Sequence, residues 1–164
     1  MHYLIDGHNL IPNVAGLSLA DPDDEMKLVH MLNDFCRIRR QRVSVFFDGA
    51  PVGMSGASKI GLVEVNWVPR GISADSAIAR RLRSMKGAAR NVAVVSSDRQ
   101  VQASASASRA TILSAAAFAN KMIDALREAP EAGQERSTSL SDEEVAEWMA
   151  LFRGERHRDD KSLR

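Results

Sequence analysis

The chain has 164 residues, a mass of 17.9 kDa and a formal net charge of +1, and it is 45% hydrophobic and 26% charged. This is the length and composition of one globular domain, so wholesale disorder is excluded. No apolar run approaches the ~20 residues that span a bilayer, so we expect a cytoplasmic protein with no membrane partner.

The first half of the chain alternates between strand and helix patterns. A short apolar run at 3–5 ends at a turn signal and predicts a buried strand, and residues 23–40 carry apolar side chains at helical spacing. A second buried strand is predicted over 43–47. The glycine-rich segment 49–61 lacks periodicity and is expected to be a loop, followed by a half-buried strand at 63–67.

The second half continues the same alternation. Ser73 is placed to cap a helix that runs to about residue 85. Further elements are predicted in the order strand, short helix, short strand and alanine-rich helix, at 92–95, 98–107, 110–113 and 114–128. Strands that alternate with helices at this spacing indicate βαβ units, so we expect an α/β fold with a mostly parallel central sheet.

The last part of the chain has a different character. Residues 129–140 contain Pro, Gly and Ser without periodicity and are predicted to be a linker after a domain at 1–128. Residues 141–164 are predicted to form an amphipathic helix and a charged tail, because a capping box at 141–144 precedes a run of apolar side chains at Trp148, Met149 and Phe152. This helix is expected either to pack on its own domain or to bind a protein partner or a second copy.

Four aspartates lie where the predicted strands end. Asp6, Asp48 and Asp98 follow three of these strands, and Asp75 lies in the first turn of the helix after a fourth. The carboxyl ends of parallel strands meet at one edge of a sheet, so the four carboxylates are expected to converge there. Two carboxylates ~5 Å apart repel by about 3 kcal/mol at an effective dielectric near 20, and a divalent cation relieves this repulsion. Oxygen-only ligation favours Mg²⁺ or Mn²⁺ over zinc.

Each aspartate also has an ordinary structural interpretation. Asp before Gly is common turn chemistry, as at 6–7 and 48–49, and Asp75 or Asp98 fits the start of a helix. The coincidence of all four at one edge favours the metal site. Such a cluster, with a metal ion, can activate a water for phosphodiester hydrolysis.

Polar neighbours of the aspartates are candidates for the same site. Asn9 follows Asp6 by three residues, and Ser96 and Ser97 precede Asp98. An amide or hydroxyl at these positions can contact a water or a phosphate, although Ser97 also fits a plain helix cap. His8 is placed near the site or, equally, in a solvated turn.

Other chemistries find little support. The single cysteine, Cys36, excludes an internal disulfide and any site built from several cysteines, and a buried position on a helix is expected for it. The dinucleotide-binding G-x-G-x-x-G, the phosphate-binding G-x-x-x-x-G-K-[ST] and the zinc-binding H-E-x-x-H are all missing from the sequence.

Four segments resemble, in order and spacing, the successive motifs of the YacP-like NYN-domain ribonucleases of the PIN-like superfamily. They are LIDGHNLI at 4–11, VFFD at 45–48, SADSAI at 73–78 and VVSSD at 94–98. The resemblance covers residues 1 to about 125. It implies a PIN-like three-layer α/β/α fold and metal-dependent RNA cleavage, with Asp6, Asp48, Asp75 and Asp98 as catalytic metal ligands and Asn9 as a polar neighbour.

The sequence departs from the family pattern at two positions. His8 stands where the family often has Tyr, which changes a stacking surface but not a ligand. Ala79 stands where YacP-like members commonly place a Glu. The loss of that carboxylate is expected to weaken the second metal position or the water-activating group.

The charge distribution supports RNA as the partner. Residues 71–128 sum to +5, whereas 1–70 sum to −1 and 129–164 to −3. We place Arg70, Arg80 and Arg99 near the substrate groove, where arginines make phosphate contacts that do not depend on base sequence. Aromatic residues are only 5% of the chain, so extensive base stacking is not expected.

The leading hypothesis is a Mg²⁺- or Mn²⁺-dependent endoribonuclease whose substrate is RNA, with messenger RNA on the ribosome as one form of it. Asn9, Ser97 and the three arginines are its predicted substrate-binding residues. The alternative is a catalytically weak RNA- or ribosome-binding module of the same fold. A third hypothesis is a structural partner that binds another protein through the helix at 141–153.

Overall fold

The structure is a computed structural model, and it describes residues 1–50 and 53–129. The predicted amphipathic helix and charged tail at 141–164, and the predicted linker apart from Ala129, lie outside the described residues, so the domain boundaries stay predictions. Within the described part, no helix is both long enough and apolar enough to cross a membrane.

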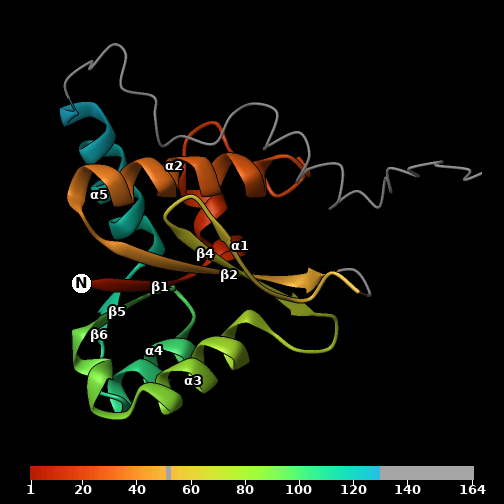
Figure 1. Cartoon of the computed structure of the whole chain (residues 1–164), viewed down its shortest axis with the longest axis vertical. Helices are drawn as coiled ribbons and strands as arrows, with labels where there is room; N and C mark the ends of the chain where they lie inside the picture. Colours follow the sequence, from red (N-terminus) through yellow and green to blue (C-terminus); the bar gives the residue numbers. More distant parts are fainter. Residues whose placement is uncertain (51–52, 130–164) are drawn as a thin grey trace, which may run out of the picture.

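A six-stranded sheet forms the centre of the fold (Figure 1). The elements along the chain are β1 His2–Asp6, α1 Gly7–Leu10, η1 Ile11–Asn13, α2 Asp24–Arg39, β2 Arg42–Ala50, β3 Gly56–Ile60, β4 Val63–Pro69, α3 Ala74–Met85, η2 Lys86–Asn91, β5 Val92–Val95, α4 Arg99–Ala107, β6 Thr111–Leu113 and α5 Ala115–Glu128. The spatial order of the strands is β3-β4-β2-β1-β5-β6, and all neighbours are parallel except β3 and β4. The predicted α/β fold with a mostly parallel sheet is confirmed.

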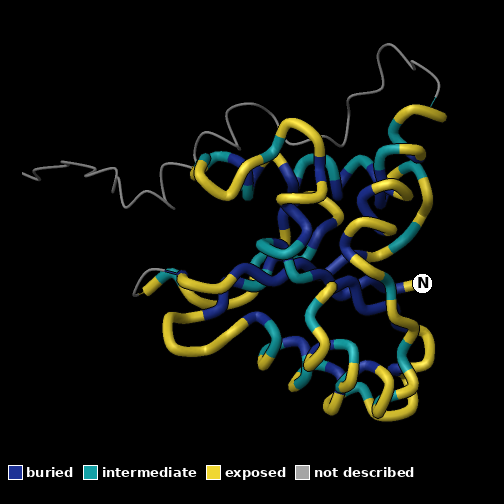
Figure 2. Tube along the Cα trace, turned by 180° about the vertical axis from the view of Figure 1, so that it is seen from behind, coloured by how far each residue is buried: buried dark blue, intermediate teal, exposed yellow. Residues whose placement is uncertain are grey.

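Successive side chains along the strands point to opposite faces of the sheet and pack into two separate hydrophobic cores. In β1, Tyr3 and Ile5 pack into the core beneath α2 and α5, whereas Leu4 packs into the core beneath α3 and α4. On the first side, Phe35 and Phe118 meet edge to face at 5.3 Å between ring centroids. Helices therefore cover both faces of the sheet, and their outer faces are exposed (Figures 1 and 2), which is the expected three-layer arrangement.

The prediction of a loop over 49–61 was wrong for residues 49–50 and 56–60, which lie in strands. Residues 56–60 form β3, which pairs antiparallel with β4 across a tight turn. The turn depends on Gly61, whose φ of +60° lies in the left-handed region. A Cβ at this position would also lie 2.5 Å from Oδ1 of Asn33, and that oxygen accepts the backbone N–H of Leu62 at 2.8 Å. Pairing with β4, rather than local periodicity, makes this segment a strand.

Candidate active site

The β1–α1 junction positions Asp6 and depends on a close packing contact. Asp6 is the last residue of β1 and caps α1, and its Oδ1 accepts the backbone N–H of Asn9 at 3.2 Å. Gly7 follows, and a Cβ there would lie 2.2 Å from Cε1 of Phe47. Phe47 is fully buried and stacks on Trp67 at 5.2 Å. Glycine therefore allows the chain to turn directly over the Phe47 ring.

Asp48 lies in an irregular part of β2. The register between β2 and β4 shifts between Phe47 and Ala50, and Gly49 has a φ of +73°. Such bulges redirect a side chain at the end of a strand. The side chain of Asp48 is about half exposed, at 46%, which leaves it accessible to solvent.

Asp75 and Asp98 occupy the beginnings of α3 and α4. Asp75 is the second residue of α3, behind the capping hydroxyl of Ser73. Asp98 is itself the N-cap of α4, and its Oδ1 accepts the backbone N–H groups of Gln100 and Val101 at 2.8 and 3.2 Å. Both predicted helix starts are confirmed, so these carboxylates have capping or first-turn positions in addition to any ligand role.

The pKa shifts link the carboxylates to one another. The pKa of Asp6 is raised to about 6, chiefly by burial, while the backbone hydrogen bond from Asn9 acts against this rise and the negative charges of Asp75 and Asp48 add to it. Burial also raises the pKa of Asp75, followed in effect by the charges of Asp98 and Asp48. Asp6 and Asp75 are close enough to share a hydrogen bond. The structure thus brings Asp6 and Asp75 together, with Asp48 and Asp98 near enough for their charges to act on one or both of them.

The four aspartates suit a hard cation chemically but do not close around one by themselves. Within residues 1–50 and 53–129, no group of three or more His, Cys, Asp or Glu side chains is close enough to hold a metal ion. The donors are all carboxylate oxygens, and burial, with a smaller effect of neighbouring negative charge, raises the pKa values of Asp6 and Asp75. Carboxylate oxygens are the donor type that Mg²⁺ or Mn²⁺ prefers, so these side chains fit such an ion in their chemistry.

His8 connects the site to α2 through a contact that sequence reasoning missed. Its Nδ1 lies 2.7 Å from Oδ1 of Asp48, and its Nε2 lies 2.6 Å from Oε1 of Glu25. The hydrogen bond to Glu25 raises the pKa of His8 to about 9 against the opposing effect of burial, and Asp48 contributes in the same direction. His8 is thus an ion-paired neighbour of the aspartates. Glu25 carried no sequence signal beyond its place in the first turn of a helix.

Asn9 and Ser97 meet directly beside the aspartates. The side-chain oxygen of Asn9 accepts the backbone N–H of Ser97 at 2.9 Å, which ties the end of β1 to the loop after β5. The Ser97 hydroxyl accepts the backbone N–H of Ala115 at 3.3 Å, and the Ser96 hydroxyl accepts that of Asp98 at 3.1 Å. The three side chains therefore fix the loop that presents Asp98.

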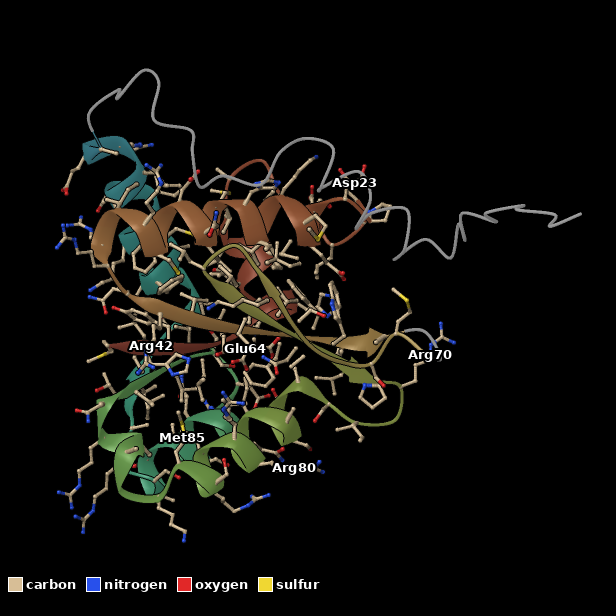
Figure 3. All side chains as sticks on the ribbon, in the orientation of Figure 1. Asp23, Arg42, Glu64, Arg70, Arg80 and Met85 are labelled. Carbon is tan, nitrogen blue, oxygen red and sulfur yellow. The ribbon has the colours of Figure 1, made fainter. Side chains whose placement is uncertain are left out.

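The predicted arginines are not drawn into the cluster. Arg70, Arg80 and Arg99 are exposed, and no ion pair within the described part of the chain joins them to the four aspartates. Arg70 directly follows the end of β4, and Arg80 lies on α3 (Figure 3). Ala79, also on α3, follows Asp75 by about one helical turn, so no carboxylate supplements Asp75 there.

Comparisons with known proteins agree with this fold. The model of the YacP-like NYN domain family matches residues 3–153. The crystal structure of Rae1 (YacP) from Bacillus subtilis is similar with a TM-score of 0.65 at 20% identity, covering 94% of this chain and 89% of that chain. A tryptophan-to-leucine mutant of the same Bacillus subtilis protein has a TM-score of 0.63 at 21% identity, covering 77% of each chain. A search of curated proteins finds no match.

Proposed function

Because the chain belongs to the YacP-like NYN domain family, which has a nuclease-like fold, we propose that it is an endoribonuclease that hydrolyses RNA phosphodiester bonds with a divalent metal ion. The proposed ligands of Mg²⁺ or Mn²⁺ are Asp6, Asp48, Asp75 and Asp98. One feature supports the proposal most: carboxylates from four separate segments lie at the carboxyl edge of the sheet, where burial and the neighbouring negative charges raise the pKa values of Asp6 and Asp75.

Each residue of the proposed site has a distinct task. A divalent cation supplies Lewis-acid activation of a water and neutralises charge on the phosphate. Asp6 and Asp75 provide the uncompensated negative charge that attracts a cation to this place. The ion pair with His8 orients the Asp48 carboxylate, and the Asn9–Ser97 hydrogen bond holds the loop that carries Asp98.

RNA is the proposed substrate, and its backbone is bound by Arg70, Arg80 and Arg99. The family supports a nucleic acid of this kind, and the exposed guanidinium groups can contact phosphates without reading bases. These contacts predict cleavage that weakens as salt rises. Asn9 and Ser97 are proposed to support this site mainly by position, because they are already hydrogen-bonded to each other.

The proposal is tested by incubating end-labelled single-stranded RNA with the wild type and Asp6→Asn, in Mg²⁺, in Mn²⁺ and in EDTA. We expect cleavage that requires metal and that Asp6→Asn lowers by about 10²-fold or more, because loss of even an outer-shell partner of a metal ligand typically costs about 10- to 100-fold. Asp124→Asn, an exposed change on α5, is the matched control and should cleave like the wild type. Cleavage that persists in EDTA or in Asp6→Asn contradicts the proposal.

A second candidate function is RNA binding with weak or no catalysis. Ala79 favours it, because this position lacks a carboxylate that would add to Asp75. Its signature is a wild-type protein that binds RNA but cuts none of several substrates in either metal. Ala79→Glu would then be expected to produce cleavage, whereas the leading proposal requires it only to increase an existing rate.

A further inference from the structure

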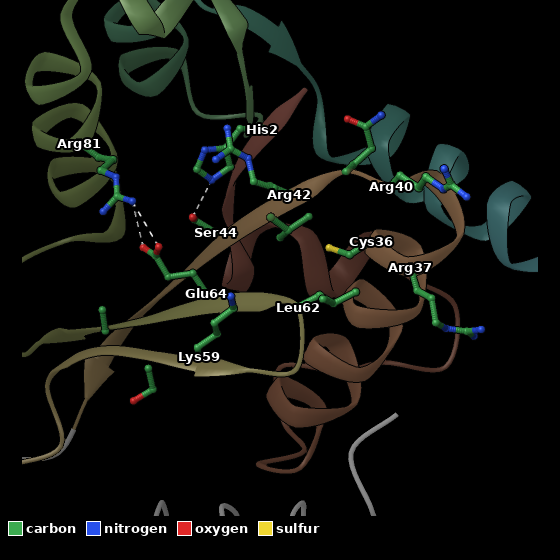
Figure 4. Close-up of a pocket in the computed structure, with 14 residues that line it drawn as sticks. His2, Cys36, Arg37, Arg40, Arg42, Ser44, Lys59, Leu62, Glu64 and Arg81 are labelled. Carbon is green, nitrogen blue, oxygen red and sulfur yellow. Dashed lines mark hydrogen bonds and ion pairs between the residues drawn. The ribbon is translucent and has the colours of Figure 1, made fainter. Parts of the chain in front are cut away.

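A basic cavity of about 760 Å³, drawn in Figure 4, has none of the four aspartates in its lining. Its charged lining consists of five cations and a single carboxylate, namely Arg37, Arg40, Arg42, Lys59, Arg81 and Glu64. The volume is within the range of ~300–1,000 Å³ that is typical of small-molecule sites. The proposed active site uses none of these residues.

The cavity opens at the amino ends of the parallel strands. It is lined by His2 at the start of β1, by Arg42 at the start of β2 and by Glu64 near the start of β4. Ser44 in the cavity and Asp48 at the proposed active site are four residues apart on β2, which corresponds to about 13 Å along an extended strand. The cavity is therefore distinct from the carboxylate edge.

The positive charge of the cavity is mostly uncompensated. Glu64 pairs with Arg81 at 3.2 Å. By contrast, Arg40, Arg42 and Lys59 form no ion pair with any residue that the structure describes. Three cations collected around one cavity without partners repel one another, and an anionic ligand would relieve that repulsion.

His2 forms the floor of the cavity, and the cations around it affect its pKa. His2 is nearly buried, at 9% exposure, and its Nε2 is hydrogen-bonded to Oγ of Ser44 at 2.8 Å. Burial lowers the pKa of His2, and the nearby charges of Arg42 and Arg81 lower it further. The guanidinium groups thus act together at this floor, where a neutral imidazole adds hydrogen-bonding capacity without further charge.

An apolar wall stands beside the cations. Leu62, at the tip of the β3–β4 turn, lines the cavity with 45% of its surface exposed. Its backbone N–H is anchored by Oδ1 of Asn33 at 2.8 Å, so this exposed side chain has a fixed base. A ligand that suits both surfaces combines phosphate with a flat, partly apolar group, as a nucleotide does.

We propose that this cavity binds one nucleotide unit, with its phosphate held by the cations Arg42 and Lys59, with Arg40 adding positive charge at the rim, and its base resting against Leu62. The unit can belong to an RNA strand or be a free mononucleotide, because both present the same chemistry. This inference goes beyond the proposed ribonuclease activity and does not depend on metal.

The test measures binding in EDTA, with AMP and with a fluorescent single-stranded oligonucleotide as separate probes. Arg40→Ala/Arg42→Ala/Lys59→Ala should weaken binding at least tenfold and flatten the salt dependence of the affinity, by about 0.7 in log–log slope for each phosphate that is no longer neutralised. The control Arg83→Ala/Lys121→Ala/Arg127→Ala removes three exposed cations elsewhere and should bind within about twofold of the wild type. Lys59→Glu, an exposed change on β3, provides a variant that leaves the core intact.

The two probes separate the sources of the ligand. Saturable AMP binding that perturbs the NMR resonances of His2 and Leu62 identifies a free nucleotide as sufficient. Binding of the oligonucleotide alone, with the same weakening in the cavity variant, identifies a unit of RNA. Equal weakening in the cavity and control variants, AMP shifts confined to residues near Asp6, or no binding of either probe would overturn the proposal. Absence of RNA cleavage leaves it standing, because binding is measured without metal.

Discussion

The two ends of the central strands carry opposite charge in different physical states. At the carboxyl ends, the carboxylates of Asp6 and Asp75 are half-buried, and their pKa values are raised by burial and by one another. At the amino ends, three of the five cations of the basic cavity are exposed and form no ion pair with another described residue, whereas Arg37 and Arg81 are paired with carboxylates. The carboxylates of the acidic edge therefore have shifted pKa values, as is common at catalytic sites. The cations of the basic edge instead provide fixed positive charge that can bind an anion. The net charge of +1 conceals this separation.

The largest expected effect on folding comes from the backbone turn beneath the acidic edge. Gly7→Ala places a methyl group against the buried Phe47 ring, which cannot retreat because it packs between His8 and Trp67. We expect the free energy of unfolding to fall by about 2–3 kcal/mol, as for other overpacked cores. Urea denaturation measures this change. Gly87→Ala is the matched control, because a Cβ there meets nothing, and equal losses of stability in both variants would refute the close-packing account.

A smaller effect of opposite sign is expected from Asp6→Asn in EDTA. The pKa of Asp6 is raised from 3.8 to about 6 in the folded protein, so folding is penalised as pH rises through this interval, and the full penalty is present above it. Asparagine can still accept the capping hydrogen bond from Asn9. The variant should be more stable than the wild type by about 1–2 kcal/mol at pH 7.5, with the advantage shrinking toward pH 4. A variant of equal or lower stability at pH 7.5 would contradict this.

The ion pairs of His8 should give a pH dependence of the reverse sign. Its pKa is raised to about 9 by Glu25 and Asp48, so its stabilising contribution is complete below pH 6.5 and is lost as pH rises through 9. A double-mutant cycle with His8→Gln and Glu25→Gln should give a coupling of about 1–2 kcal/mol at pH 6. Urea denaturation should show that this coupling energy declines by pH 9. A coupling energy that does not change with pH would mean that His8 carries no positive charge at the acidic edge.

The smallest effect is expected at the basic edge. Removal of Arg40, Arg42 and Lys59 together should change the free energy of unfolding by no more than about 0.5 kcal/mol, because exposed side chains without ion pairs contribute little. Thermal unfolding of the triple variant checks this. A destabilisation similar to that of Gly7→Ala would mean that the cavity cations have a structural role, and the contrast between the two edges would fail.

The sequence was most informative where local pattern and final environment agree. The buried strands, the capped helices and the aspartates at the strand ends follow from periodicity and from the geometry of parallel sheets. The β3 strand was missed because its pairing with β4, made through the turn at Gly61, decides its conformation. The His8–Glu25 contact joins residues 17 positions apart and depends on where α2 begins. The basic cavity is lined by residues from several helices and strands that are distant in sequence, so no sequence motif predicts it.

The direction of the helices has a further consequence. α2, α3 and α4 begin at the acidic edge, where Glu25, Asp75 and Asp98 lie in their first turns or caps, and α2 ends at the basic cavity beside Arg37 and Arg40. A helix carries about half a positive charge at its amino end and half a negative charge at its carboxyl end. The peptide dipoles thus oppose the side-chain charge at both edges. If the two charge clusters were exchanged, the carboxylates would lie beside the negative ends of helices and the cations beside the positive ends. The direction of the helices therefore favours the observed placement of acidic and basic side chains.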